Sequence, residues 1–448
     1  MNPKIGLFQG IGLVVASMIG SGVFVSSGFM LQASLSPFEI MLEWIIGGCW
    51  AFSGAILYVH IAKNFPKNGG EPAYIKEYIG PNIGQVVAIL TILIGFICPI
   101  AFDTLVAASY LQSIFQIGSP KLIASVILLS FMVLNFLPSK ASLSDFVQQG
   151  LVLLKIIIIL TISIVGLHWL QSTSSFVSYQ VQPVGTSKIE TLLQQQYWVV
   201  YAFSGFNASI YLVERFRHPK KHVKYSMYFG ISFVFVCYLL LNHVFVQTLQ
   251  HTDIAQVAMT DNFTQITLGH ILLQKMMGPS YGTVMSCLMV VIFLSSISVM
   301  IQLVLPICVS VIGDFRSKQE QKLCSQRMVL WIGALGFILI WISGARDLLS
   351  SISFLIYLVS SLTVSLILFN RLPQRSPIWI RSLSFVYIAI SMTLLAYGMT
   401  DASYMETFLF LLLTGCAWLL VRLPNVFNKK LNIEEPTPQS IINEFQGS

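Results

Sequence analysis

Charged residues are scarce in this sequence. Of its 448 residues only 10% are Asp, Glu, Lys or Arg, whereas 55% are hydrophobic. A soluble globular domain carries about 25% charged residues. The deficit comes from long windows without any charged residue, such as Val86–Phe102, Tyr281–Gly313 and Ser351–Asn370. About 20 apolar residues suffice for a helix to cross the ~30 Å hydrocarbon layer of a bilayer. The composition therefore excludes a soluble domain and predicts an all-α integral membrane protein.

Cysteine pairs and catalytic motifs are also missing. The seven cysteines lie mostly inside apolar segments and form no Cys-x-x-Cys pair, which argues against structural disulfides and a zinc site. The sequence contains no P-loop, HExxH or GxSxG motif, so nothing in it indicates nucleotide hydrolysis or membrane hydrolase chemistry. The formal charge of +7 could suggest a nucleic-acid partner, but the basic residues lie in short runs between apolar segments. We therefore expect no enzyme activity, cofactor, bound metal or nucleic-acid partner.

The apolar runs and their charged, proline and glycine breaks predict about twelve transmembrane helices within residues 1–424. They cover roughly residues 5–31, 38–62, 83–113, 121–137, 142–169, 191–213, 225–249, 281–313, 327–345, 347–370, 378–398 and 403–423. The longest connecting stretches are 171–190 and 250–280. The polar segment 425–448 has little apolar content and is expected to be a disordered cytoplasmic tail.

The basic residues predict how these helices are oriented. If the N-terminus is cytoplasmic, 20 of the 25 Lys and Arg residues fall in cytoplasmic loops and 4 on the opposite side. The remaining one, Lys155, lies inside a predicted helix. Such an excess of positive charge is typical of cytoplasmic loops. We therefore expect a multi-pass protein of the cytoplasmic (inner) membrane with both termini in the cytoplasm.

Two of the predicted helices contain breaks near mid-membrane. The first carries Gly20-Ser21-Gly22, and the sixth carries Ser204-Gly205 followed by Asn207. Glycine costs about 1 kcal/mol relative to alanine in a helix interior, and irregular backbone at this depth survives only where it is buried or lines a cavity. Taken alone, the first break could also reflect close helix packing through small residues. Two interrupted helices five spans apart instead match inverted repeats whose breaks meet at a midplane substrate site.

Three segments resemble motifs of the amino acid–polyamine–organocation (APC) superfamily. ASMIGSGVF (16–24) is similar to the first-helix signature of that family, and FPKNGGEPAYIKEYIGP (65–81) resembles the loop after its second helix. YAFSGFNASIYLVERFRHPKKHV (201–223) resembles its sixth helix and the loop that follows. The resemblance implies a LeuT-type core of two inverted five-helix repeats, about 5–169 and 191–370, with two further helices over about 378–423.

The resemblance also implies a set of substrate-binding residues. In similar transporters the substrate carboxylate lies on the backbone of the first-helix break, here Gly20, Ser21 and Gly22. The α-amino group is bound by backbone carbonyls, here around Ile19, Phe203 and Ser204. Tyr201 matches an aromatic residue that gates the pocket, and Phe206 and Asn207 match the aromatic–Asn pair of the L-type branch.

Two charged residues are expected deep in the membrane. Lys155 lies in LVLLKIIIIL of the fifth predicted helix, where a charge costs a few kcal/mol and usually has a function. Similar proton-coupled permeases carry a lysine on this helix in place of a sodium ion, which implies a coupling role. The alternative is a lysine that snorkels to the surface or pairs structurally. Asp103, in the third predicted helix, could pair with a lysine, help to select a cationic substrate, or hold helices together.

These features together predict a secondary active transporter of amino acids that works by alternating access. Its expected partners are an amino acid, the lipid bilayer and protons, with coupling either to protons or to exchange. The nearest alternative is a polyamine or organic-cation exchanger, in which Asp103 would matter more. A non-transporting amino acid sensor on the same fold is a further alternative, although the short termini lack an obvious signalling extension.

Overall fold

The computed structural model describes residues 5–33, 35–116, 118–136, 141–172, 188–249, 268–312 and 318–422. Over these ranges the regular elements are all helical. In chain order they are α1 (Leu7–Met18), α2 (Gly22–Gln32), α3 (Pro37–Asn64), α4 (Gly70–Tyr78), α5 (Pro81–Leu90), η1 (Thr91–Ile97), α6 (Cys98–Phe115), α7 (Pro120–Phe136), α8 (Ala141–Ser172), α9 (Lys188–Ala202), η2 (Ala208–Arg215), α10 (Pro219–Thr248), α12 (Leu268–Met277), α13 (Pro279–Ile312), α14 (Lys318–Ile342), α15 (Ala345–Leu368), α16 (Ile378–Asp401) and α17 (Tyr404–Arg422).

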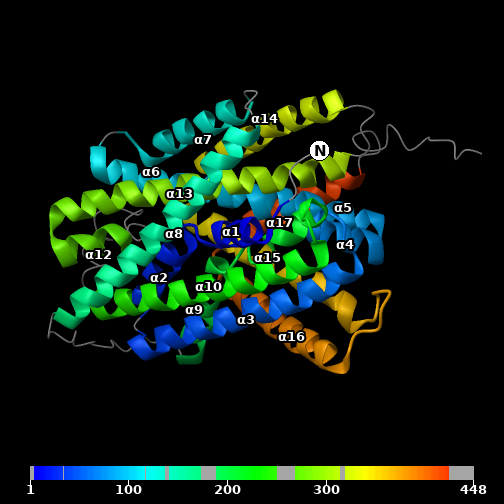
Figure 1. Cartoon of the computed structure of the whole chain (residues 1–448), viewed down its shortest axis with the longest axis horizontal. Helices are drawn as coiled ribbons and strands as arrows, with labels where there is room; N and C mark the ends of the chain where they lie inside the picture. Colours follow the sequence, from blue (N-terminus) through cyan, green and yellow to red (C-terminus); the bar gives the residue numbers. More distant parts are fainter. Residues whose placement is uncertain are drawn as a thin grey trace, which may run out of the picture.

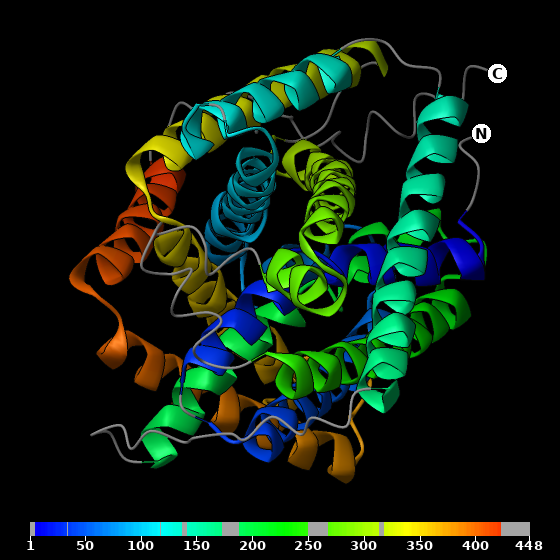
Figure 2. The same ribbon diagram turned by 90° about the vertical axis from the view of Figure 1, so that its left-hand side faces the viewer.

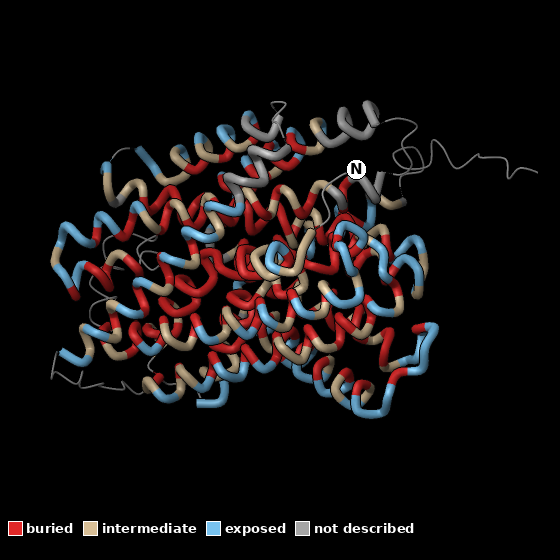
Figure 3. The backbone as a smooth tube through the Cα atoms, in the orientation of Figure 1, coloured by how far each residue is buried: buried red, intermediate tan, exposed pale blue. Residues whose placement is uncertain are grey.

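The helices form one bundle in which most of them run roughly along its long axis (Figure 1). Helix α13 packs against α6, and α10 packs against α1. Helices α7 and α14 lie side by side along one edge (Figures 1 and 2). Buried residues concentrate in the middle of the bundle, whereas exposed residues lie at its ends and on its outer helices (Figure 3). The interrupted helices α1–α2 therefore run through the core.

Within the described ranges, eight helical stretches are long and apolar enough to cross a membrane. They are Leu7–Gln32, Pro37–Asn64, Pro81–Gln112, Gln149–Ser172, Pro219–Thr248, Pro279–Leu305, Asp347–Leu368 and Ile378–Thr400. Three shorter apolar helices, Pro120–Val133, Gln326–Ile342 and Tyr404–Leu419, coincide with three more predicted spans. The sixth predicted span, 191–213, corresponds to α9 and η2. The prediction of a helical, multi-pass membrane protein is confirmed, while the count of twelve crossings stays a prediction.

The polarity of the bundle is that of a protein surrounded by lipid. Its outer edge exposes large apolar side chains, such as Val126 and Leu129 on α7 and Trp331 on α14. Small polar side chains, such as Ser296 and Ser353, are instead buried between helices. Because lipid tails are as apolar as leucine, tight packing and interhelical hydrogen bonds hold such helices together.

The fold differs from the sequence-based expectation in one predicted span and two predicted connections. The third predicted span is not regular, because η1 (Thr91–Ile97) is a π-helical stretch between α5 and α6. Pro99 explains it, since proline has no N–H and its ring would clash with the carbonyl group of Gly95 four residues earlier. Helices α4 and α12 lie in segments that were expected to be loops. The expected disordered tail, 425–448, lies outside the described residues.

Candidate functional site at the two helix breaks

The first break separates α1 from α2. Helix α1 ends at Met18, Ile19 has extended backbone angles (φ −79°, ψ 96°), and α2 begins at Gly22. Ser21 precedes α2, and its side chain makes no capping hydrogen bond to the helix. The N–H groups at the start of a helix carry partial positive charge and have no partner within the helix. The interruption predicted from the glycines is therefore present, and it leaves a buried site suited to an anion.

The second break separates α9 from η2. Helix α9 ends at Ala202, and the chain then turns through residues 203–207 before η2 begins at Ala208. Gly205 adopts a φ of +89°, a backbone conformation that glycine reaches without a steric penalty. The N–H of Ala208 donates to the carbonyl oxygen of Gly205 over 3.0 Å and closes the turn. The Ser-Gly pair thus interrupts this helix where the sequence predicted.

The two breaks meet in the core. A Cβ atom on Gly22 would lie 2.8 Å from the Cα atom of Ala202, and one on Gly205 would lie 2.6 Å from the carbonyl oxygen of Ser17. The hydroxyl group of Tyr238, on α10, lies 2.7 Å from the carbonyl oxygen of Met18 and 3.0 Å from that of Ala202. The single hydroxyl proton of Tyr238 is therefore shared between carbonyl groups at the ends of α1 and α9, which ties the interrupted helices together.

Lys155 reaches the first break from α8. Its side chain is fully buried, and its ammonium group donates to the carbonyl oxygens of Ala16 (3.2 Å) and Ile19 (2.5 Å). The third hydrogen bond goes to the hydroxyl oxygen of Ser296 on α13 (3.0 Å). A lysine ammonium has three N–H donors, so three acceptors match it fully. The ammonium occupies a small polar cage of the kind that could hold a monovalent cation.

Asp103 reaches the same break from α6. Its side chain is 1% exposed, and Oδ1 accepts a hydrogen bond from the hydroxyl group of Ser21. The hydroxyl oxygen of Ser21 also lies 3.4 Å from that of Tyr201. The other carboxylate oxygen, Oδ2, has no hydrogen-bond partner among the described residues. Asp103, Ser21 and Tyr201 form a polar group at the start of α2, next to the cage around Lys155.

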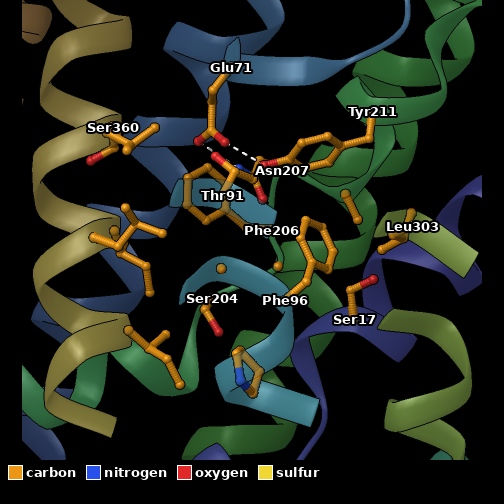
Figure 4. A pocket seen from close by; sticks show the side chains of 18 of the residues that line it. Ser17, Glu71, Thr91, Phe96, Ser204, Phe206, Asn207, Tyr211, Leu303 and Ser360 are labelled. Atoms are coloured by element: carbon orange, nitrogen blue, oxygen red, sulfur yellow. Dashed lines mark hydrogen bonds between the residues drawn. The ribbon is translucent and has the colours of Figure 1, made fainter. Parts of the chain in front are cut away.

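A cavity of about 100 Å³ opens on the other side of the breaks. Ser17 and the turn residues Ser204, Gly205, Phe206 and Asn207 line one side of it (Figure 4). The remaining wall comes from η1, α6, α13 and α15 and is mainly apolar. Its apolar residues include Phe96, Met300, Leu303, Ile352, Leu355, Ile356 and Val359. Such an apolar pocket with a few convergent polar groups is the usual form of a small-molecule site.

The polar end of the cavity is built around Glu71 on α4. Its carboxylate accepts hydrogen bonds from the hydroxyl groups of Tyr58 (2.6 Å) and Tyr211 and from the side-chain amide of Asn207 (2.9 Å). Figure 4 shows Asn207 and Tyr211 beside the carboxylate of Glu71. Burial raises the pKa of Glu71 above its ordinary value of 4.5, and the three donated hydrogen bonds oppose this only in part. No group of three metal-ligating side chains occurs in the described part of the chain.

Comparison with known proteins identifies the family. A family model described as amino acid permease matches residues 5–433. The chain belongs to the amino acid permease family. The b(0,+)-type amino acid transporter 1 of Mus musculus is 26% identical over 263 residues, which is 57% of this chain and 53% of that protein. The large neutral amino acids transporter small subunit 2 of Homo sapiens is 25% identical over 290 residues, 62% of this chain and 52% of that protein. The chain spans about half the length of these curated relatives. The predicted membership of the APC superfamily is thus confirmed.

The site residues predicted for this permease fall into three places. Ser204, Phe206 and Asn207 line the cavity. Tyr201 and the first-break residues 19–22 lie at the junction of the breaks, beside Asp103 and Lys155, and do not line the cavity. The side chain of Phe203 packs against the rings of Trp44 and Tyr238, so only its backbone faces the break.

Sequence reasoning missed Glu71 and its tyrosine partners in the permease. Glu71 follows Gly69-Gly70 in a segment read as a connecting loop. The available signal was an acidic side chain in a glycine- and proline-rich stretch between two membrane spans. It is weak, because such loops usually carry solvated charges, whereas Glu71 is only 6% exposed.

Proposed function

We propose that this permease transports amino acids across the cytoplasmic membrane as a secondary active transporter working by alternating access. The observation that carries the proposal is the meeting of two interrupted, buried helices beside a mainly apolar cavity. Broken helices of this kind form the midplane substrate sites of secondary transporters. The family membership and the relatives, whose names denote amino acid transporters, support amino acids as the substrate class.

The two breaks suit the two charged groups shared by all amino acids. The N–H groups at the start of α2, around Ser21 and Gly22, would bind the carboxylate. Carbonyl groups of Phe203 and Ser204 would accept hydrogen bonds from the α-ammonium group, beside the carbonyl group of Ile19, which already accepts from Lys155 and Ser296. The side chain of the substrate would then extend into the cavity between Phe206 and the apolar residues of α13 and α15. A mainly apolar wall favours a neutral, apolar side chain.

The position of Lys155 supports a sodium-independent mechanism. Its ammonium group fills the cage formed by the carbonyl oxygens of Ala16 and Ile19 and the hydroxyl group of Ser296. A sodium ion would compete for the same oxygens. We therefore propose that transport is coupled to protons or to exchange, with Lys155 in the place of a coupling cation. We also propose that both termini lie in the cytoplasm.

An amine substrate is the second candidate, and one observation favours it. Asp103 presents a buried carboxylate oxygen without a hydrogen-bond partner in the described ranges. Such an oxygen could bind the ammonium group of a polyamine or another organic cation. The apolar cavity and the family membership favour amino acids over this alternative.

Uptake into proteoliposomes tests the proposal. Purified protein is reconstituted and supplied with labelled amino acids and polyamines, with and without an inward proton gradient and with unlabelled substrate inside. We expect uptake of at least one apolar amino acid, either driven by the gradient or dependent on internal substrate. Uptake of polyamines alone would favour the amine exchanger. Binding of amino acids without any uptake would favour a sensor and overturn the proposal.

A further inference from the structure

Asp103 and the cage around Lys155 meet at Gly20 in the first break. A Cβ atom on Gly20 would lie 3.4 Å from Oδ2 of Asp103 and 3.1 Å from the hydroxyl oxygen of Ser296. Ser296 in turn accepts from Lys155 and donates to the carbonyl oxygen of Ile19 over 3.1 Å. The carboxylate and the ammonium group are therefore near neighbours without a direct hydrogen bond.

Lys155 has no N–H group left for another partner. Its three hydrogen bonds, to Ala16, Ile19 and Ser296, use all the donors of an ammonium group. Asp103 is different, because only Oδ1 is hydrogen-bonded and Oδ2 is buried without a partner within the described ranges. Of the two charged groups, Asp103 is the one with an atom available to take up a proton.

The N-terminus of α2 brings Oδ2 of Asp103 close to the proposed position of the substrate. Ser21 already donates its hydroxyl to Asp103, so the aspartate lies where the unpaired N–H groups of α2 attract an anion. An amino acid carboxylate that binds at Ser21 and Gly22 would come close to Asp103. Two carboxylates that share one buried site do not both stay ionised, so one of them takes up a proton. The substrate carboxylate has the N–H groups of α2, which leaves the proton to Asp103.

The other titratable groups around Asp103 do not change this assignment. Tyr201 on α9 and Tyr238 on α10 face it, and both are neutral phenols at neutral pH. Lys155 on α8 is the positive charge that faces it. Ser21, which precedes α2, and Ser296 on α13 also lie close to it, and their hydroxyl groups do not titrate. Lys155 can therefore balance an ionised Asp103 in the empty site.

We propose that Asp103 carries the coupled proton of this permease, and that binding of the substrate carboxylate at Ser21 and Gly22 drives its protonation. The proposal rests on the proposed function. One proton would enter with each substrate from one side of the membrane and bind Oδ2 of Asp103. When the substrate leaves on the other side, the proton leaves Oδ2 too. Asp103 is then again an ionised carboxylate beside Lys155, with Ser21 donating to its Oδ1. In this scheme Lys155 does not carry the coupled proton.

Accumulation under a proton gradient tests the proposal, with the membrane potential clamped to zero. One proton per substrate allows about tenfold accumulation for each unit of inward pH gradient. We expect the wild type to reach this tenfold accumulation. Asp103→Asn should equilibrate the substrate without accumulating it. Glu406→Gln is the matched control, because Glu406 is a buried carboxylate that accepts from Ser350 on α15, away from the breaks; it should accumulate like the wild type.

Each outcome decides a separate question. Accumulation by Asp103→Asn would overturn the proposal and leave the transport function intact. The proposal is also overturned, with the transport function intact, if the wild type exchanges substrate but does not accumulate it under the proton gradient. If Asp103→Asn is inactive in every mode, Asp103→Glu decides, because it retains a carboxyl group. Gradient-driven accumulation by Asp103→Glu supports the proposal, and its absence makes Asp103 a structural residue. Failure of the wild type to transport anything would overturn the proposed function itself.

Discussion

Gly205 lies directly against the carbonyl group of Ser17, at the point where the sixth predicted helix crosses the end of α1. A Cβ atom at position 205 would lie 2.6 Å from the carbonyl oxygen and 2.9 Å from the Cβ atom of Ser17. The φ of +89° at Gly205 adds a second reason for glycine at this position. The close approach of the two breaks therefore depends on the missing side chain.

We expect Gly205→Ala to disrupt this junction. Alanine in a left-handed conformation costs about 1–2 kcal/mol, and the overpacked contact adds roughly 1–3 kcal/mol. Thermal unfolding in detergent should occur at a lower temperature, and uptake should fall at least tenfold (roughly 1.4 kcal/mol on the transport barrier). Gly415→Ala on α17 is the control, because a Cβ atom there meets no atom within 4 Å. Equal behaviour of the two variants would contradict the close packing at the breaks.

Tyr238→Phe should loosen the tie between α1 and α9. The change leaves the carbonyl groups of Met18 and Ala202 without the hydroxyl group that lies 2.7 and 3.0 Å from them. Unsatisfied buried acceptors cost about 1–3 kcal/mol, so the unfolding temperature should drop by several degrees. Tyr225→Phe serves as the comparison, since Tyr225 is 40% exposed at the periphery. An unchanged unfolding temperature for Tyr238→Phe would show that the bridge is not structural.

The sequence predicted the existence of the breaks better than their surroundings. Gly20, Gly22 and Gly205 are visible as helix-breaking residues inside apolar windows, because local propensity and membrane burial conflict there. The partners of Tyr238 could not be predicted in the same way. They lie 36 and 220 residues away in the chain, and a tyrosine in an apolar span gives no sign of which carbonyl groups it will reach.

Lys155 could be predicted as a site residue from the sequence and Glu71 could not, because only the burial of Lys155 follows from its neighbours in the sequence. Lys155 stood out because a charge within an apolar run is costly wherever the helix packs. Glu71 becomes a buried carboxylate only because α4 folds back onto Tyr58 and η2, and its partner Asn207 is 136 residues away. Its polar neighbours in the sequence concealed that burial. Tertiary contacts, and not local composition, decide such sites.

Lys155→Met tests whether the lysine is a fixed cation or the proton carrier. Methionine keeps the length of the side chain but leaves the carbonyl oxygens of Ala16 and Ile19 without their donor. Removing one partner from a buried charge cluster costs about 3–5 kcal/mol, so uptake should fall by at least tenfold. If Asp103 carries the proton, the residual uptake keeps its dependence on pH. A flat pH profile in Lys155→Met, together with a normal profile in Asp103→Asn, would assign the proton to Lys155.

Glu71 should make the stability of the permease depend on pH. Burial raises its pKa in the folded protein above 4.5, so the folded state holds this proton more tightly than the unfolded chain. The stabilisation is complete below the unfolded pKa and is lost as the pH rises through the folded pKa. Unfolding temperatures measured in detergent should therefore decrease as the pH rises above the ordinary carboxyl pKa of 4.5. Glu71→Gln removes the titrating group and should flatten that part of the profile, whereas Glu77→Gln, at an exposed position on the same helix, should not. A profile in Glu71→Gln as steep as in the wild type would mean that another group governs the pH dependence, and that Glu71 serves the cavity only as an acceptor for Tyr58, Asn207 and Tyr211.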